Sequence, residues 1–409
     1  MFRSVFRFYG SSLLTRIQQI RTECKSTAAF GNNRGELSKI LKERNLKSIE
    51  LGTILLTLKS VSKKYTDHPD LWESIKIQYK SSKTRYDAET LSILIWVLKI
   101  VSCEDRYFAG SVIKELPQHI PKFKTKHIVM SMEGLAMYSE FLTQELIQLL
   151  GNRIIELEGS FSSSDIPRIA KYLRLLSESF DWDLYVYDVI ERETLRNKNQ
   201  LNLRQLGSIL SMLSKVVYKR PSDFFTIIQN TIIEKIPTIN HPSVVPIILN
   251  CYSQMKNVIS FSKIYNLFES HILENPLMYL KNINDMVMII HSYSKFDYKR
   301  IMELCPKYLP ELPQDLISRK NTLGVYLYSV IRSPPNPEYE AKAIRWIFEH
   351  RESISSLHQK KILVTMLETK NNNKEFWENF HKLDLKFQPS DSPYIIKVLP
   401  QLKALNLIQ

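Results

Sequence analysis

Basic side chains interleaved with aromatic ones recur in this chain just after apolar stretches. Three clusters carry this pattern, and the members that could make contacts are Lys63 and Lys64, then Lys215, Tyr218, Lys219 and Arg220, then Lys295, Phe296, Tyr298, Lys299 and Arg300. Lysine and arginine attract phosphate groups, and a neighbouring aromatic ring can stack on an unpaired base. The clusters therefore predict contact with a single-stranded nucleic acid. A second interpretation stays open, because cations near helix C-termini also complement the helix dipole and aromatic rings also fill cores.

A further basic stretch reads PKFKTKH and supplies Lys122, Lys124 and Lys126. It lies between two expected helices, so these lysines should face solvent, where they would meet a polyanion or simply remain solvated. The whole chain has 56 basic and 42 acidic residues, which leaves a net charge of +14. This balance suits an anionic partner such as nucleic acid.

Sequence patterns for catalysis, metal binding or cofactor binding are missing. The histidines are scattered and form no H-E-x-x-H motif, and the four cysteines form no C-x-x-C pair. No G-x-S-x-G, G-x-G-x-x-G or Walker glycine-lysine loop occurs. We therefore expect no catalytic residue, no metal ligand and no cofactor, and a protein that is not an enzyme.

The elements that would position the basic clusters follow a repeat. An apolar or tyrosyl residue followed by serine returns at intervals of 35 to 41 residues, and the serines are Ser62, Ser102, Ser139, Ser177, Ser214, Ser253, Ser294 and Ser329. A period of about 38 residues over most of a chain is typical of a helical solenoid. Large apolar residues three and seven positions before the one that precedes each serine predict a helix with one buried side. We expect the small serine to let the next helix approach, rather than to be a simple surface residue near a helix end.

The chain is predicted to be all-α, an α-solenoid of about ten stacked helical hairpins. The expected pairs are 36–45 with 48–65, 70–83 with 87–103, 106–117 with 124–140, 143–157 with 163–179, 182–197 with 202–218, 222–235 with 241–256, 260–273 with 280–295, 298–308 with 313–331, 337–351 with 355–369, and 374–383 with 391–406. No segment approaches eighteen uninterrupted apolar residues, so a membrane span is not expected.

The N-terminal segment 1–22 is basic and amphipathic and contains no acid. These features are typical of a mitochondrial presequence, and they predict delivery to the mitochondrial matrix. Residues 23–35 end in a glycine- and asparagine-rich run and are expected to form a flexible linker. The helical-repeat solenoid would then occupy residues 36–409.

The two-helix unit, its L-x-x-h-L-x-x-[LY]-S-[KE]-like second helix and the N-terminal address resemble the heptatricopeptide-type repeats of organellar RNA-binding proteins related to the FAST-kinase family. The resemblance covers roughly residues 36–370 and implies an α-solenoid that works on mitochondrial RNA. Many such proteins end in a small α/β RAP domain. The tail here, from Pro389 to Gln409, is short and helix-like, so that domain and any nuclease activity tied to it are not expected. HEAT-like repeats have a similar length and would keep the fold while changing the partner.

Two hypotheses about function follow. The first is a non-catalytic mitochondrial RNA-binding protein that acts on ribosomal or messenger RNA, in RNA stability, processing or ribosome assembly, through the basic residues named above. The second is a protein–protein scaffold, a subunit of the mitochondrial ribosome or of a respiratory-chain assembly.

Overall fold

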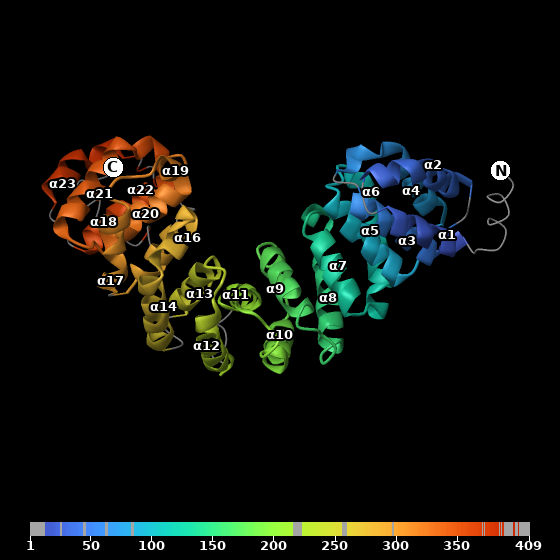
Figure 1. Cartoon of the computed structure of the whole chain (residues 1–409), viewed down its shortest axis with the longest axis horizontal. Coiled ribbons are helices and arrows are strands. Elements are labelled where there is room, and N and C mark those ends of the chain that lie inside the picture. The colour runs from blue at the N-terminus through green and yellow to red at the C-terminus, as the bar shows by residue number, and fades with distance from the viewer. Residues whose placement is uncertain are drawn as a thin grey trace. The chain divides into compact units, whose positions relative to one another are not determined.

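The computed structural model describes residues 13–24, 27–43, 46–61, 64–82, 86–215, 223–255, 260–296 and 298–369, followed by 371, 373–383, 385, 387, 396 and 400. Throughout these residues the regular structure is helical, and no strand occurs among them (Figure 1). The chain divides into two compact units, Met1–Leu201 and Asn202–Gln409. In both units, helices pack against neighbours in the sequence and against the helix one pair further along.

The first unit contains two rows of helices. One row consists of α1 (Leu13–Glu23), α3 (Ser48–Val61), α5 (Ala88–Ile100), α7 (Thr125–Leu135) and α9 (Asp165–Leu176), each packed against the next. The other consists of α2 (Thr27–Glu43), α4 (Pro69–Ser82), α6 (Arg106–Glu115), α8 (Gln144–Glu156) and α10 (Leu184–Asn197), in which α2 packs on α4 and α8 on α10. Short 3₁₀ turns connect some of them, namely η2 (Tyr65–Asp67), η4 (Leu116–Gln118), η5 (Ile120–Lys122) and η6 (Ser139–Phe141).

The second unit repeats this arrangement. Its first row is α11 (Leu203–Leu213), α13 (Val244–Gln254), α16 (Ile283–Tyr293), α20 (Lys320–Arg332) and α22 (Ser356–Glu368), again with each helix packed against the next. Its second row is α12 (Phe224–Lys235), α14 (Ser262–Glu274), α17 (Lys299–Met302) with α18 (Leu304–Tyr308), α21 (Pro337–Glu349) and α23 (Lys374–Asn379). The remaining elements are η8 (Ile236–Thr238), α15 (Pro276–Leu280), α19 (Gln314–Ile317), η9 (Arg351–Ser353) and η10 (Phe380–Lys382).

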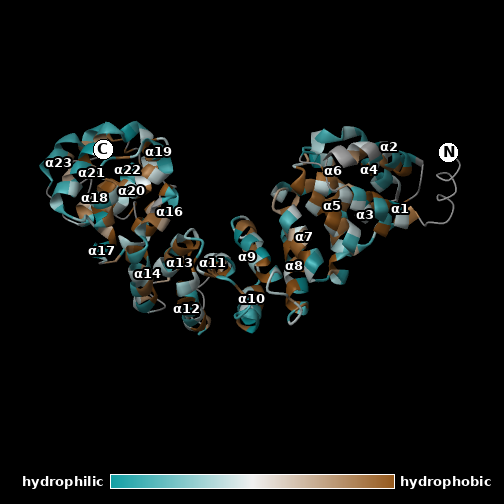
Figure 2. Cartoon of the chain, viewed as in Figure 1, coloured by the Kyte–Doolittle hydropathy of each residue, from teal (hydrophilic) through white to brown (hydrophobic). Residues whose placement is uncertain are grey.

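Apolar periodicity explains which helix side is buried. In α11, Leu206, Leu210 and Leu213 are all buried, as their spacing predicts. Figure 2 shows that the helices carry both hydrophobic and hydrophilic residues, as expected of helices that bury one side.

Side-chain caps fix several helix starts. The carboxylate of Asp87 accepts a hydrogen bond from the backbone N–H of Thr90 at the start of α5, and Asp105 does the same for Phe108 in α6. Asn202 caps α11 in a reciprocal arrangement with Gln205. These caps set where the helix pairs begin.

Most predicted helices match described ones with small shifts at their ends, but α2 begins nine residues before the predicted 36–45. The predicted helices 298–308 and 313–331 are each divided in two, into α17 with α18 and into α19 with α20. The short helix α15 was not predicted, because five residues are too few to show a helical period. The final predicted helix, 391–406, lies outside the described residues except for two isolated positions.

The prediction of a flexible linker at 23–35 is wrong, because most of this segment is helical. Helix α2 starts at Thr27 and runs through Gly31 and Gly35. Each glycine costs a helix about 1 kcal/mol relative to alanine, but Phe30 is buried here and contacts the ring of His68. Packing of this kind outweighs a weak local propensity.

Half of the predicted presequence belongs to the packed structure. Residues 1–12 lie outside the described residues, whereas α1 packs against α3 and buries Ile17 and Ile20. Arg16 forms a two-pronged ion pair with Glu36, with nitrogen–oxygen distances of 2.7 and 2.5 Å. Residues from Leu13 onward therefore contribute to the core.

The repeated serines behave differently in the two units. The expected packing role is consistent with the burial of Ser214, Ser253, Ser294 and Ser329 in the second unit. It is wrong in the first unit for the exposed Ser102, Ser139 and Ser177, and Ser62 lies outside the described residues.

Ser102 shows the alternative role. It has a φ of +51° and ends α5, where the N–H of Cys103 donates to the carbonyl of Leu98. This is the hydrogen bond of a Schellman helix end. Here the serine terminates a helix at the surface.

Candidate functional site

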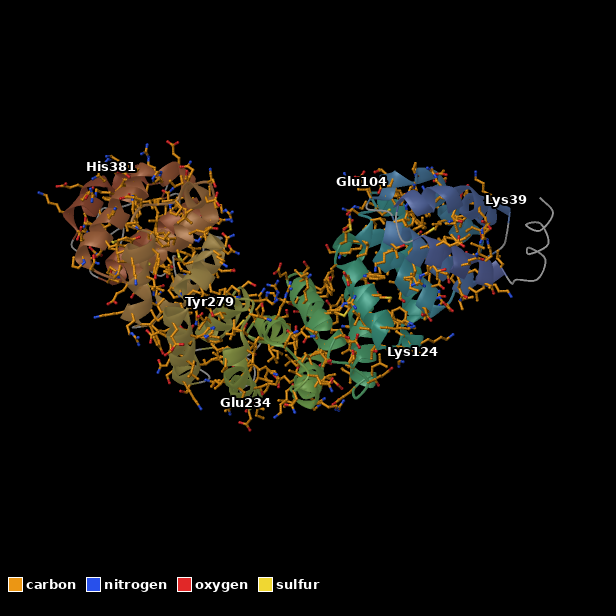
Figure 3. The ribbon with its side chains drawn as sticks, in the orientation of Figure 1. Lys39, Glu104, Lys124, Glu234, Tyr279 and His381 are labelled. Atoms are coloured by element: carbon orange, nitrogen blue, oxygen red, sulfur yellow. The ribbon has the colours of Figure 1, made fainter. Side chains whose placement is uncertain are left out.

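The lysines of the PKFKTKH stretch point to solvent while its aromatic residues are buried. Lys122, Lys124 and Lys126 are exposed on η5 and at the start of α7, whereas Phe123 and His127 are buried against each other (Figure 3 labels Lys124). Lys126 pairs with Glu89 of α5 at 2.5 Å, and both side chains are about half exposed. An exposed pair of this kind adds little stability. The stretch is thus available for contacts with a ligand.

The other predicted residues of the first unit lie near η2. Lys64 is exposed directly before η2, and its backbone N–H donates to Asp67. Lys63 lies outside the described residues.

The cluster that follows α16 mixes exposed cations with packed rings. Lys299 and Arg300 are exposed at the start of α17, and a guanidinium nitrogen of Arg300 lies 3.8 Å from a carboxylate oxygen of Glu269. Phe296 packs on Phe261 with ring centroids 4.3 Å apart, and Tyr298 is 5.2 Å from Tyr293. These two rings are half-buried parts of an aromatic cluster that joins α14 to α16.

Lys295 contacts the preceding repeat. Its Nζ donates to the hydroxyl of Ser253 at 2.9 Å and lies 3.5 Å from the amide oxygen of Asn250. The residue after one repeated serine thus reaches back to the serine of the preceding repeat. Of the cluster after α11, Lys215 is exposed, and Tyr218, Lys219 and Arg220 lie outside the described residues.

The same polar connection recurs along the first row of the second unit. Ser214 of α11 lies 3.4 Å from the side-chain oxygen of Gln254, which follows Ser253. Between α16 and α20, Nδ1 of His291 is 3.0 Å from the Ser329 hydroxyl, and Thr322 donates to Asn284. Both of these last pairs join residues that are 38 apart in the sequence.

That separation corrects the register of the eighth repeat. Adding 38 to 294 gives 332, so the structural partner of Ser294 is Arg332 and not Ser329. The interval of 35 residues between the two serines came from matching the wrong residue. Ser329 instead occupies the position of His291, one helical turn earlier.

A row of cations on the first unit was missed by the sequence reasoning. Nζ of Lys59 in α3 lies 4.5 Å above the ring of Trp96 in α5. One turn further along α5, Lys99 pairs with Glu133 of α7 at 3.0 Å, and Arg168 of α9 pairs with the same carboxylate at 2.7 Å. We call Lys59, Lys99, Arg168 and the exposed Lys171 the basic row.

The four positive charges of the basic row exceed the single negative charge of Glu133, the carboxylate that Lys99 and Arg168 contact. Glu133 is 12% exposed. Burial alone would raise the pKa of its carboxyl, but hydrogen bonds from Arg168 and Lys99 bring the pKa below its usual range. One carboxylate therefore faces two cations, with Lys59 and Lys171 beside them. A sequence signal existed, since Lys59 and Lys99 both lie three residues before a repeated serine.

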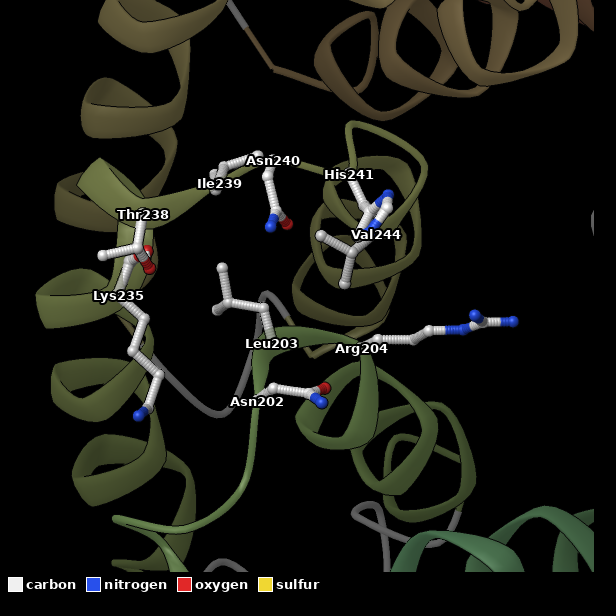
Figure 4. A pocket seen from close by; sticks show the side chains of 9 residues that line it. All are labelled: Asn202, Leu203, Arg204, Lys235, Thr238, Ile239, Asn240, His241 and Val244. Carbon is white, nitrogen blue, oxygen red and sulfur yellow. Dashed lines mark hydrogen bonds between the residues drawn. The ribbon is translucent and has the colours of Figure 1, made fainter.

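A cavity of about 490 Å³ opens between the start of α11, the end of α12 with η8, and the start of α13. Its polar lining includes Asn202, Lys235, Asn240 and His241 (Figure 4). Figure 4 shows the Asn240 side chain turned toward Leu203 and the Arg204 side chain extending away from the other lining residues.

The described residues contain no group of three or more histidine, cysteine, aspartate or glutamate side chains that could hold a metal ion. Within this same part of the chain, every helix is too short or too polar to cross a bilayer. Comparisons with protein-family models and with curated proteins give no match for this chain.

Proposed function

We propose that this chain is an α-solenoid repeat protein of the mitochondrial matrix that binds RNA without catalysing a reaction. Its role would lie in the stability or processing of ribosomal or messenger RNA, or in ribosome assembly. Paired helices that pack one repeat apart within each unit support the solenoid, as does the resemblance to heptatricopeptide-type repeats. A presequence confined to residues before α1 would leave the core of the first unit intact.

The basic row is the observation that carries this proposal. Its cations come from α3, α5 and α9, helices whose neighbours in the row pack side by side. Packed helices lie roughly 10 Å apart, so the row places positive charge along a track of roughly 30 Å. An RNA backbone presents negative charge along its length, and such a track would follow it.

Different residues would contact the phosphates and the bases of the RNA. Lys59, Lys171 and the exposed turn lysines Lys64, Lys122 and Lys124 would contact phosphates, as would Lys299 and Arg300 in the second unit. Trp96 is half-buried and lies beneath Lys59, so the exposed part of its ring would offer a stacking surface beside that cation. We retain Lys63, Tyr218, Lys219 and Arg220 as proposed contacts. Phe296 and Tyr298 would contribute only through what remains exposed of their rings.

Binding of a labelled single-stranded RNA across a salt series tests the proposal. Affinity should fall steeply with salt, by about 0.7 in the logarithmic slope for every phosphate contacted. Lys59→Glu with Lys171→Glu should weaken binding and reduce this slope. Lys122→Glu with Lys124→Glu tests the turn edge in the same way.

The matched control is Lys80→Glu with Lys114→Glu, two exposed lysines on α4 and α6 in the other row of the same unit. It makes the same change in net charge, so it should leave most of the affinity in place. Equal losses in the control and the basic-row variant would mean that only overall charge matters. Wild-type binding that is absent or independent of salt would refute the proposal.

The scaffold hypothesis has its own support in exposed apolar side chains. Tyr107 on α6 is 93% exposed, and Leu184 and Tyr185 at the start of α10 are 41% and 62% exposed. Tyrosines such as Tyr107 and Tyr185 are common anchors in protein interfaces. Purification of the protein from mitochondria with and without nuclease separates the two, because a scaffold would keep its protein partners after RNA is destroyed.

A further inference from the structure

A second cavity in the second unit, of about 360 Å³, lies at the C-terminal ends of α16, α20 and α22. The lining residues that matter here are Lys295, Arg332, Ser333, Thr365, Thr369 and Glu368. They come from three successive helices of one row. The cavity therefore exists only when those helices are packed together.

Thr365 lines this cavity and has an unused hydrogen-bonding group. Its side chain is 2% exposed, and its hydroxyl has no partner. A threonine in a helix commonly donates to the carbonyl four residues earlier, as Thr369 does to Thr365. Leaving a buried hydroxyl unpaired is unfavourable, so this position suits a ligand that accepts its hydrogen bond.

Two cations border the same space. Arg332 donates to the neutral hydroxyl of Tyr328 at 2.7 Å, and Lys295 donates to the hydroxyl of Ser253. Glu368, the acidic member of the lining, is exposed at the end of α22. The lining thus carries two cations and one acid.

Basic side chains of the lining also act on the neighbouring His291. Burial first, and then the charges of Lys295, Lys361 and Arg332, lower the pKa of its imidazole to about 3. The carbonyl ends of three helices disfavour an anion, so the cations of the lining would have to outweigh them.

We propose that this cavity binds one phosphate group, with Arg332 and Lys295 balancing its charge and the hydroxyls of Thr365 and Ser333 donating to its oxygens. A phosphate oxygen accepts several hydrogen bonds at once, which is what a buried hydroxyl beside two cations offers. The identity of the natural ligand as RNA rests on the proposed function. The phosphate is either a terminal monoester or an internal diester of that RNA, or a free phosphate ion.

The test uses the full chain and titration calorimetry at constant ionic strength. The probes are inorganic phosphate and one oligoribonucleotide, prepared with a 5′-phosphate and with a 5′-hydroxyl. Thr365→Val keeps the shape of the side chain and removes the hydroxyl, and Arg332→Gln removes one charge. Each should lower phosphate affinity roughly tenfold, the order expected for one hydrogen bond to a charged group.

Thr231→Val is the matched control. Thr231 is buried in α12 of the same unit, and its hydroxyl already donates to the carbonyl of Ile227. This variant should bind phosphate as the wild type does. Circular dichroism shows whether each variant is folded, and Thr365→Val should unfold no more easily than the wild type because it removes an unpaired polar group.

The outcomes separate this inference from the proposed function. Phosphate binding that Thr365→Val and Arg332→Gln weaken supports the cavity, even if the chain binds no RNA. Wild-type protein that binds RNA but takes up no inorganic phosphate, and whose RNA affinity is unchanged in both variants, overturns the cavity and leaves RNA binding intact. A preference for the 5′-phosphorylated oligonucleotide assigns the cavity to a terminal monoester, and equal affinity for both assigns it to an internal diester.

Discussion

At the residue scale, the second unit keeps two histidines uncharged among cations. Burial first, and then neighbouring basic groups, lower the pKa of His291 to about 3 and that of His358 to about 4. Lys361, which contributes to both shifts, has its own pKa lowered by burial. The folded state therefore resists protonation in this region.

Stability should fall as the pH drops below neutrality. The unfolded histidines have a pKa near 6.5 and take up protons first, so stability is complete above that value and is lost progressively toward the folded-state values. Between pH 7.5 and 5.5 each histidine should cost about 1.4 kcal/mol. Urea unfolding of wild type and His291→Gln at these two pH values checks this.

His291→Gln should remove the contribution of His291 to the pH dependence of the unfolding free energy, which is about half of the contribution of the two histidines together. His381 is exposed on η10, so His381→Gln is the control and should leave the pH dependence unchanged. An identical pH dependence in wild type and His291→Gln would contradict the predicted role of His291.

Residue identity alone could not separate ligand contacts from core contacts. Phe296 and Tyr298 stand beside cations in the sequence, yet they pack on Phe261 and Tyr293. Lys295 has the charge expected of a phosphate contact, yet it reaches Ser253 on the preceding repeat. Phe261 lies 35 residues before Phe296, and Ser253 lies 42 residues before Lys295. No local sequence pattern reveals contacts at such separations.

At the element scale, glycine marks where two helices of a row come closest. A Cβ atom on Gly134 of α7 would lie 2.6 Å from the backbone oxygen of Ile95 in α5. At Gly35 in α2, by contrast, nothing lies within 4 Å of such an atom. Glycine is therefore required by close packing at Gly134, whereas a larger residue fits at Gly35.

Gly134→Ala should destabilise the first unit by about 1–3 kcal/mol, because the backbone of α5 must move. Gly35→Ala should stabilise it by about 0.5–1 kcal/mol, because alanine is the better helix former. Chemical unfolding of both variants alongside the wild type measures the two effects. Equal effects of the two substitutions would show that α5 and α7 are not so tightly packed.

Helix pairs could be predicted from the sequence because each buries one apolar side at the helical period. The first half of α2, before residue 36, was not predicted as helix because its glycines and asparagines indicate a turn, and only its contacts with other helices show otherwise. The role of the repeated serines was also predicted only in part. The same dipeptide ends an exposed helix turn at Ser102 and lies buried between repeats at Ser253.

At the scale of the whole molecule, the chain consists of two compact units that meet in sequence at Leu201 and Asn202. The sequence predicted one continuous array, because the serine pattern continues past this point without a break. Nothing in the composition marks the division. It depends on where contacts are dense, which is a property of the folded chain.

Residues 1–201 and 202–409 should each fold when produced alone, because each contains its own row of packed helices and its own buried core. Circular dichroism should show a helical spectrum and a cooperative thermal transition for both fragments. A fragment that ends at residue 104 loses α7, which packs on α5, and should unfold more easily than 1–201. Two half-chains that are both unfolded would contradict the division.

The hydrogen bonds between helices of a row have a consequence for the order of folding. Ser253 contacts Lys295, and His291 contacts Ser329, so each bond needs only the hairpin that precedes it in the sequence. A chain that enters its compartment with the N-terminus first can therefore pack each new hairpin onto its predecessor while later segments have yet to arrive. Assembly would proceed from the N-terminus to the C-terminus, without waiting for the far end of the polypeptide.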